Sequence, residues 1–434
     1  MKCIEDEIPF DVPEGWVWTR FSSITINRDS ERKPLSSSQR MNVAKKYDYY
    51  GASGKIDKVD KYIFNERLLL IGEDGANLVT RSKPIAFFAD GLYWVNNHAH
   101  CVDSPDKFIL NYLYFYINAI SLEKYVTGSA QPKMTQDKMN SILVSIPPYN
   151  EQKRLRQHLN ELIAVVNNIE YEKGEVLAFA SKVKAKVLDL AIRGLLVPQA
   201  PDDEPASVLL ERIRAEKEDL IKQGKLKRDK KEFIIFKGED NSYYEKIGSN
   251  VKNINDEIPF ELPDSWAWCR GYSCFEGMSS TKPQGEYFDY IDIDAIDNRL
   301  HKIKGAKHLP VYNAPSRASR SVKNGSVLFS LVRPYLENIA LVEEKHSSCV
   351  ASSGFYICNS NGTFLPEFMF YLMISRYVVD GLNQYMKGDN SPSISKDNIE
   401  GWLYPVPPFK EQKAIYAKLQ SVFALIESIE KSLS

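Results

Sequence analysis

Two stretches of the chain carry apolar residues at helical spacing, and each begins just after a Pro-Pro-aromatic sequence. Because Pro147-Pro148 and Pro407-Pro408 cannot lie inside a helix, each pair marks a helix start. The first stretch predicts a helix from Asn150 to about Ile192, roughly 65 Å long at 1.5 Å per residue. The second predicts a helix from Lys410 to Lys431. In the first helix, the apolar positions that recur at spacings of three and four residues are Leu155, Leu159, Leu162, Val166 and Ile169. The residues that extend this seam are Leu177, Val183, Val187, Leu188 and Leu190. Two such seams favour antiparallel pairing of the helices.

The segments before these helices have a different pattern, with short apolar runs between turn residues. Arg67–Gly72, Pro84–Phe88 and Ser326–Leu331 are predicted strands. Phe108–Ile120 and Pro366–Val379, rich in Tyr, Phe and Leu, are predicted helices. Between the two halves, a charged helix is expected over residues 205–222, followed by a basic run at residues 225–231. The basic run fits a solvated linker as well as a DNA contact.

The chain is duplicated internally with a long period. Asp6–Arg20 and Asp256–Arg270 share nine of fifteen residues at an offset of 250, including P-x-x-W. Ile146–Glu170 and Val406–Glu430 share PP-aromatic-x-EQK at an offset of 260, and the twenty residues before each match loosely. The intervening segments, Tyr47–Ala86 and Phe288–Val327, do not match. In a duplication that had simply drifted, sequence similarity would be lost evenly over frames and inserts. Similar frames with two different inserts therefore favour a protein that carries two distinct recognition surfaces.

Composition limits the classes of function. Lys plus Arg number 56 and Asp plus Glu 57, a net charge of −1, which excludes a globally basic DNA coat but not local basic faces. The six cysteines form no C-x-x-C pair, so no zinc ribbon is indicated. The N-terminus has no apolar signal core and no run of about 18 apolar residues occurs, so we expect a cytoplasmic protein with reduced thiols and no membrane span.

With these motifs, the chain resembles the specificity subunit of type I restriction–modification systems. The resemblance rests on both duplicated motifs, on the central stretch Gly194–Lys231 and on Tyr93–His98, and covers nearly the whole chain. It implies an α+β fold in which two β-rich target recognition domains are joined by two long antiparallel coiled-coil helices in a pseudo-two-fold repeat. The expected domains are residues 1–148 (first recognition domain), 149–255 (helical spacer), 256–407 (second recognition domain) and 408–434 (C-terminal helix).

The resemblance also implies the function. Each recognition domain would read one half of a bipartite site in double-stranded DNA, and the helices would set the gap between the halves. Two modification (methyltransferase) subunits and the restriction (translocase and endonuclease) subunits of a prokaryotic cytoplasmic complex are the expected partners. This chain would itself be non-catalytic and hold no cofactor or metal, with AdoMet, ATP and Mg²⁺ on the partner subunits.

Four short sequences resemble catalytic or metal-binding motifs only in part, or are missing from the chain. The PP-aromatic sequences resemble the [DN]-P-P-[YF] motif of amino-methyltransferases, but Ile146 and Val406 cannot accept the hydrogen bond of a target amine. No G-x-x-x-x-G-K-[ST] loop occurs. Residues 97–101 (NHAHC) lack a fourth metal ligand, and alternation would place His98 and His100 on one strand face with Cys101 opposite. Asp292, Asp294 and Asp297 fit the solvent face of a strand. Two alternatives stay open: a self-sufficient AdoMet-dependent adenine methyltransferase, and a coiled-coil scaffold without a DNA role.

The candidate binding residues are polar or basic and lie in turn-rich segments, where phosphate and base contacts are expected. The DNA-binding candidates are Lys45, Lys46, Ser53, Lys55, Arg81, Lys83, Gln131, Lys133, Lys282, Arg317, Arg320, Arg333, Lys387 and Asn390. The candidates for the helix frame and partner docking are Pro147, Pro148, Glu151, Gln152, Pro407, Pro408, Glu411 and Gln412.

Overall fold

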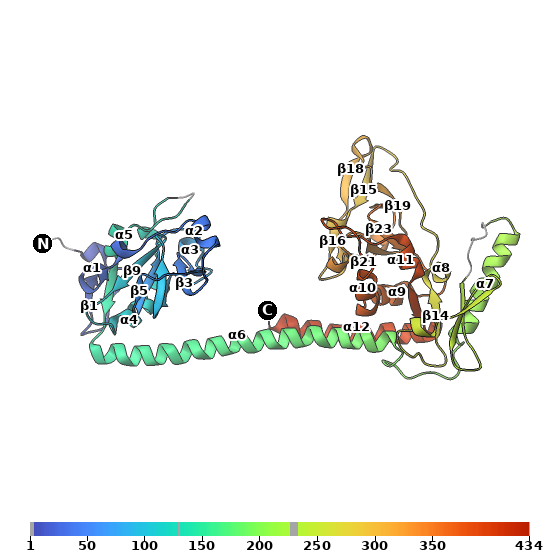
Figure 1. The fold of residues 1–434 in the computed structure, drawn as a ribbon, viewed down its shortest axis with the longest axis horizontal. Coiled ribbons are helices and arrows are strands. Elements are labelled where there is room, and N and C mark those ends of the chain that lie inside the picture. Colours follow the sequence, from blue (N-terminus) through green and yellow to red (C-terminus); the bar gives the residue numbers. More distant parts are fainter. Residues whose placement is uncertain (1–3, 129–130, 226–232, 434) are drawn as a thin grey trace. The chain divides into compact units, whose positions relative to one another are not determined.

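The computed structural model describes residues 4–128, 131–225 and 233–433. The chain divides into two compact units, Met1–Glu170 and Tyr171–Ser434, and each is treated by itself (Figure 1). Residues 4–148 are called the first module, and residues 256–407 the second module. None of the described helices combines the length and apolar character that a membrane span needs.

The first unit is a β-rich module followed by the start of a long helix. Its strands form a pair β1-β10 and two four-stranded sheets, β4-β3-β8-β5 and β2-β9-β6-β7. The strands are β1 Val17–Arg20, β2 Ile26–Asn27, β3 Tyr47–Gly51, β4 Gly54–Val59, β5 Phe64–Asn65, β6 Leu68–Gly72, β7 Ala86–Ala89, β8 Leu92–Val95, β9 Ala99–Asp103 and β10 Leu143–Ile146. The helices are α1 Phe21–Ile24, α2 Ser37–Met41, α3 Asn77–Thr80, α4 Ile109–Ala119, α5 Gln136–Asn140 and α6 Tyr149–Ile192.

The second unit contains the end of α6, a central insertion, the second module and the C-terminal helix. Its helices are α7 Ala206–Lys222, α8 Gly271–Cys274, α9 Pro366–Met373, α10 Arg376–Asn383, α11 Lys396–Gly401 and α12 Phe409–Ser432. Its strands are β11 Phe233–Lys237, β12 Tyr243–Ile247, β13 Asn250–Asn253, β14 Ala267–Arg270, β15 Tyr287–Ile291, β16 Ile296–Asp297, β17 Lys302–Ile303, β18 Lys307–Pro310, β19 Ala318–Ser321, β20 Val327–Ser330, β21 Ile339–Leu341, β22 Val350–Ser352, β23 Phe355–Cys358 and β24 Leu403–Val406. Strands β11 to β13, inside the predicted helical spacer, form an antiparallel sheet.

The two modules share one topology, including the inserts whose sequences do not match. The sheet β4-β3-β8-β5 of the first module corresponds to β18-β15-β22-β19 of the second. In both sheets the two central strands are parallel, β3 with β8 and β15 with β22, and both outer pairs are antiparallel. The pairs of β6 with β7 and β9 likewise correspond to those of β20 with β21 and β23. The inserts therefore share these strand pairings although their sequences differ, and the second insert adds the small sheet β16-β17.

The second unit confirms the pairing of the two long helices. Lys184 of α6 donates a 2.8 Å bond to Glu430 near the end of α12, whereas Gln199, seven residues after α6, bonds to Glu411 at the start of α12. This order is antiparallel. Leu188 of the predicted seam is buried in the core that also contains Ile415 and Leu419 of α12.

The seam is buried over only part of its length. Leu162, Val166 and Ile169 of α6 are 62%, 52% and 59% exposed. The apolar pattern therefore predicted the helix correctly but did not tell which of its positions are covered within this chain.

Two predicted elements end earlier than the sequence pattern suggested. The helix expected over Pro366–Val379 is divided into α9 and α10, because Ser375 caps the second helix through a bond from the Val378 amide. The strand expected through Asp292–Asp297 ends at Ile291, and Asp292 caps a 3₁₀ turn by accepting a bond from the Ala295 amide. Local side-chain caps outweigh alternation at both places.

Candidate functional site

The duplicated sequence motifs form the same contact in each module. The indole Nε1 of Trp16 donates to Oε2 of Glu151 at 3.1 Å, and that of Trp266 donates to Oε2 of Glu411 at 3.0 Å. Each bond links the P-x-x-W entry of a module to the EQK helix that follows it. Strand pairs β1-β10 and β14-β24 link the same two ends through the main chain.

A second pair of equivalent contacts fixes the entry strands. Arg20 donates to the Ser141 carbonyl at 2.7 Å and to Glu7 at 2.7 Å. Arg270 donates to the Gly401 carbonyl at 2.8 Å and to Glu257 at 2.6 Å. Several of the nine identical residues of the entry motif therefore form hydrogen bonds that hold the entry segment in place and join it to the end of the same module. The structure thereby gives these repeated residues a physical role within the frame.

The Gln of each EQK motif bonds inside its own module. Gln152 donates to the Pro147 carbonyl at 2.9 Å, and Gln412 donates to the Pro407 carbonyl at 3.1 Å. Glu411 and Gln412 are 4% and 0% exposed. The side chains of Glu411 and Gln412 therefore stabilise the start of α12 from inside the second unit. Pro148 and Pro408 lie at the starts of α6 and α12.

Three loops of the first module are joined by main-chain hydrogen bonds. They are the turn after β6 (residues 73–75), the turn before β9 (residue 98) and residues 127, 128 and 131–134. The bonds run from Glu73 N to His98 O (2.9 Å), from Gly75 N to Pro132 O (2.9 Å), from Met134 N to Glu73 O (2.7 Å), and in both directions between Thr127 and Lys133 (2.8 Å each). These loops are called the loop cluster of the first module.

The second module has an equivalent loop cluster with the same five bonds. It consists of residues 331–333, residue 354 and the segment 387–394. The bonds run from Leu331 N to Gly354 O (2.8 Å), from Arg333 N to Pro392 O (2.7 Å), from Ile394 N to Leu331 O (2.9 Å), and in both directions between Lys387 and Ser393 (3.0 Å each). The main chain is thus conserved between the clusters while the side chains differ. The same loop backbone can therefore present two different sets of side chains.

Some first-module candidates lie at its loop cluster. Gln131 is exposed and Lys133 is half exposed, with its Nζ 3.1 Å from Glu73. Ser53 lies in the turn between β3 and β4, and the neighbouring Ala52 carbonyl lies against Gly72 at the end of β6. Lys55 follows this turn and pairs with Asp48 at 2.6 Å.

The other first-module candidates lie away from the loop cluster or bond within the fold. Arg81 donates to the Ile117 and Asn118 carbonyls and also to that of Ile120 at the end of α4, which stabilises that helix end. Lys45 pairs with Asp57 at 2.8 Å, and Lys46 lies over the Tyr47 ring. Lys83 is exposed. Sequence alone could not separate these lysines from those at the cluster.

The second-module candidates divide in the same way. Arg333, Lys387 and Asn390 are exposed residues of the loop cluster, and Arg333 Nη2 donates to the Asn390 carbonyl at 3.0 Å. Arg317 is exposed, and its carbonyl accepts a 2.7 Å bond from the amide of Ser353, next to Gly354. Arg320 is partly buried in β19, and Lys282 lies exposed before β15.

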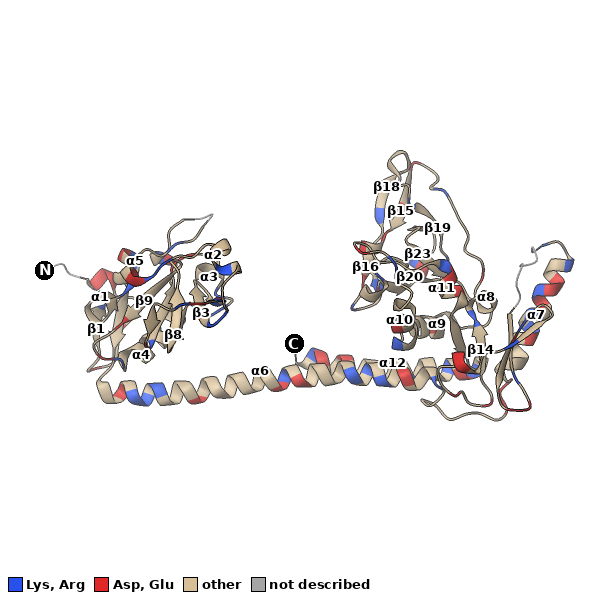
Figure 2. Ribbon diagram, viewed as in Figure 1, with Lys and Arg blue, Asp and Glu red and all other residues tan. Residues whose placement is uncertain are grey.

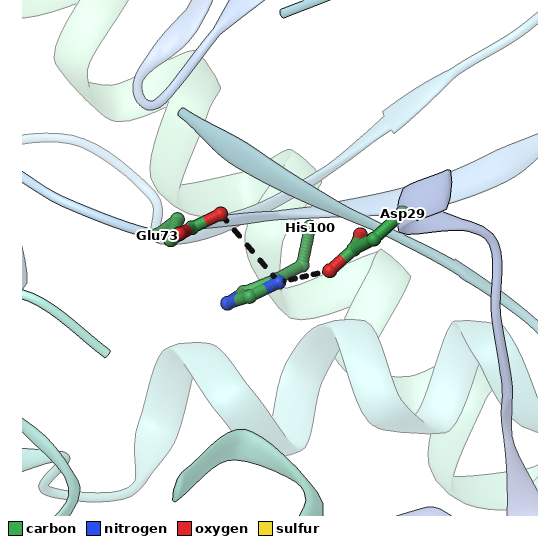
Figure 3. A group of neighbouring side chains, drawn as sticks. All are labelled: Asp29, Glu73 and His100. Atoms are coloured by element: carbon green, nitrogen blue, oxygen red, sulfur yellow. Dashed lines mark hydrogen bonds and ion pairs between the residues drawn. The ribbon is translucent and has the colours of Figure 1, made fainter. Parts of the chain in front are cut away.

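Glu73 of the first loop cluster lies next to Asp29 and His100 (Figure 3). His100 Nδ1 lies 2.6 Å from Asp29 Oδ2, and its Nε2 lies 2.9 Å from the Met134 carbonyl. Both ring nitrogens are therefore engaged within the protein, one by a carboxylate and one by a main-chain carbonyl. Glu73 accepts from Arg32 at 2.6 Å.

Asp29, Glu73 and His100 bring three potential metal-ligating atoms together. Each of these atoms already bonds to another protein group, and Arg32 supplies a positive charge to both carboxylates. This geometry favours a charged network that supports the Met134 end of the loop cluster. The expected common face for His98 and His100 is wrong, since His98 lies in the exposed turn before β9 and His100 is buried within it.

Several residues of this site were not found from sequence. Asp74 was not a candidate, yet its Oδ2 lies 2.7 Å from His98 Nδ1. Asp29 and Glu73 lie far apart in sequence from the histidine they neighbour. Such long-range pairs leave no local pattern. Figure 2 shows acidic and basic residues interspersed over the described parts of both units, in keeping with the net charge of −1.

The comparisons with known proteins agree with this architecture. Residues 13–177 match the family model described as type I restriction modification DNA specificity domain. The chain is 23% identical to the EcoAI specificity subunit of Escherichia coli, over 96% of this chain and 79% of that protein. It is 24% identical to the EcoEI specificity subunit of the same species, over 100% and 82%.

A solved structure, the HsdS subunit from Thermoanaerobacter tengcongensis, is 32% identical over the matched part. That match covers 40% of this chain and 46% of the other, so it spans less than half of the solved subunit, with a TM-score of 0.38. The fold and the loop clusters define a duplicated protein with two recognition modules of one topology. Residues 13–177 match a type I restriction–modification DNA specificity domain, and over nearly its full length the chain is similar to specificity subunits of type I restriction–modification systems.

Proposed function

We propose that the chain selects the target of a type I restriction–modification complex by binding a bipartite site in double-stranded DNA, one half-site to each module. The observation that carries this proposal is the pair of loop clusters. They share five main-chain hydrogen bonds and differ in the side chains they present. A protein that binds one repeated ligand would need equal side chains at equivalent positions. Different side chains on one main chain fit two different half-sites.

This chain binds DNA and does not itself catalyse a reaction. Lysines and arginines on the modules contact phosphates and set the register, while side chains at the loop clusters select base edges. Methylation of adenine, translocation and cleavage belong to the partner subunits, which carry AdoMet, ATP and Mg²⁺.

Helix α6 sets the gap between the half-sites. Its 44 residues correspond to about 66 Å at 1.5 Å per residue, against roughly 34 Å for one turn of DNA. Two modules of modest affinity on one chain also bind DNA more tightly than either module alone, because the second binding event becomes intramolecular.

Two modification subunits dock on the helical frame, and restriction subunits join them. The exposed apolar residues Leu162, Val166 and Ile169 of α6 support this part of the proposal. Clustered apolar residues on an exposed helix face are typical of a protein-binding surface.

The decisive experiment is a base-resolution map of methylated adenines in host DNA with and without this gene. Loss of one split, asymmetric motif upon deletion is the expected result. Exchange of residues 47–139 for another insert should then change one half-site only, and two added helical turns in residues 155–190 should change only the gap. An isolated chain that binds AdoMet would instead revive the self-sufficient methyltransferase. A complex that binds no DNA would favour the scaffold.

A further inference from the structure

The two loop clusters differ at a position where the backbone is left-handed. Gly75 of the first module has φ +101°, and Arg333, which makes the equivalent bond to a proline carbonyl, has φ +49°. Glycine adopts this conformation freely, whereas a long side chain is strained there. An arginine in this position costs stability that a glycine would not.

The surrounding bonds hold Arg333 in this conformation. Its amide is tied to Pro392 at 2.7 Å, and its carbonyl accepts from the Leu336 amide at 2.9 Å. Its guanidinium is exposed and donates from Nη2 to the Asn390 carbonyl at 3.0 Å. This bond orients the planar guanidinium and occupies one of its five N–H donors.

Arg333 also differs from the other arginines of the second module that were candidates. Arg320 is partly buried in a strand. Arg317 is exposed but lies in the segment before β19, outside residues 331–333 and 387–394. Arg333 alone among these three is both exposed and part of the five-bond loop cluster.

We infer that Arg333 is a specificity-determining residue that reads a guanine in the half-site bound by the second module. The inference rests on the proposed function. A planar guanidinium presents two parallel donors that match O6 and N7 of guanine in the major groove. The bond to Asn390 holds the side chain in place before DNA arrives, which lowers the entropy lost on binding.

The test uses the full chain in complex with its modification subunits, and a DNA library in which both half-sites are randomised. The variant is Arg333→Gly, since glycine is preferred at φ +49° and its melting temperature should equal or exceed that of the wild type. The charge-matched control is Lys345→Gly, because Lys345 is exposed in the same module, pairs with Glu343 and lies outside the loop cluster.

The expected result is that the wild type requires a guanine at one position of one half-site. In Arg333→Gly that preference falls roughly tenfold or more while every other position is kept. Lys345→Gly should keep all preferences. Equal loss of affinity for all sequences would show a phosphate contact and overturn the inference, as would an unchanged motif. If the wild-type complex shows no sequence preference, the proposed function itself fails, which is a different outcome from a wild-type motif that Arg333→Gly leaves intact.

Discussion

Trp266 and Glu411, which are 145 residues apart, form a buried hydrogen bond of 3.0 Å that ties the entry of the second module to the start of α12. Glu411 also accepts a 2.7 Å bond from Gln199, so both carboxylate oxygens are used. Trp16 and Glu151 repeat the indole bond in the first module. In each module, the P-x-x-W motif and the EQK motif, which identify the repeat in the sequence, are therefore joined to each other by this hydrogen bond.

Removal of this carboxylate should destabilise the second unit. In Glu411→Ala, the buried indole N–H and the Gln199 amide both lose their acceptor, and we expect a loss of about 1–3 kcal/mol. The free energy of unfolding in urea measures it. The matched control is Glu151→Ala, because that side chain is partly exposed and water can replace it. An equal or larger loss in the control would contradict the argument.

The same carboxylate predicts a dependence of stability on pH. Burial raises the pKa of Glu411, although the bonds from Trp266 and Gln199 act in the opposite direction. A carboxyl whose pKa is higher in the folded state stabilises the fold fully below the unfolded pKa of about 4.3, and loses this contribution as pH rises through the folded value. Urea titrations at several pH values should show this decline in the wild type. The decline should be smaller in Glu411→Gln, and an unchanged slope would argue against the assignment.

The first module should respond to pH in the opposite direction. Burial alone would raise the pKa of Asp29, but the bond and charge of His100, with the Cys101 amide and Arg32, lower it. Its contribution to stability is present above the unfolded pKa of about 3.9 and is lost as pH falls through the folded value. At neutral pH, Asp29→Asn should cost about 3 kcal/mol, since it removes the buried carboxylate that bonds to His100 and pairs with Arg32. Asp48→Asn, at a partly exposed pair with Lys55, is the control and should stay near the wild type.

The frame could be predicted from sequence far better than the site. Proline pairs and apolar spacing located α6 and α12 to within a residue or two, because these signals are local. The common topology of the inserts could not be predicted, because strand pairs such as β3 with β8 require only apolar side chains of suitable shape and leave no shared sequence. The candidate lists had the same limit. Arg81 and Lys133 look alike in sequence, but one caps α4 and the other lies in the loop cluster.

A glycine tests whether the loop cluster of the first module determines specificity. Gly128 has φ +85°, and a Cβ there would lie 2.6 Å from the Gln131 carbonyl. Gly128→Ala should therefore shift the segment that carries Gln131 and Lys133, and relax one half-site in a methylation map. Gly388→Ala, at the equivalent turn of the second module, is the comparison, because its φ of +98° is also strained but its nearest contact is 3.6 Å. It should cost about 1 kcal/mol for the backbone alone and perturb the other half-site less. Relaxation of both half-sites by either variant would contradict modular reading.

The exposed apolar face of α6 should be needed for assembly but not for folding. Val166→Asp and Ile169→Asp place a charge on side chains that are 52% and 59% exposed, so the melting temperature should change little. If a modification subunit covers this face, burying an unpaired carboxylate should weaken the complex by about 2 kcal/mol or more, roughly 30-fold in affinity. Ala164→Asp, about 200° around the helix from Val166, places the same charge on another exposed face and is the control. Sedimentation of the chain with its modification subunit measures the affinity. Equal weakening by all three variants would point to a general effect of charge, and no weakening would show that the subunit docks elsewhere on the frame.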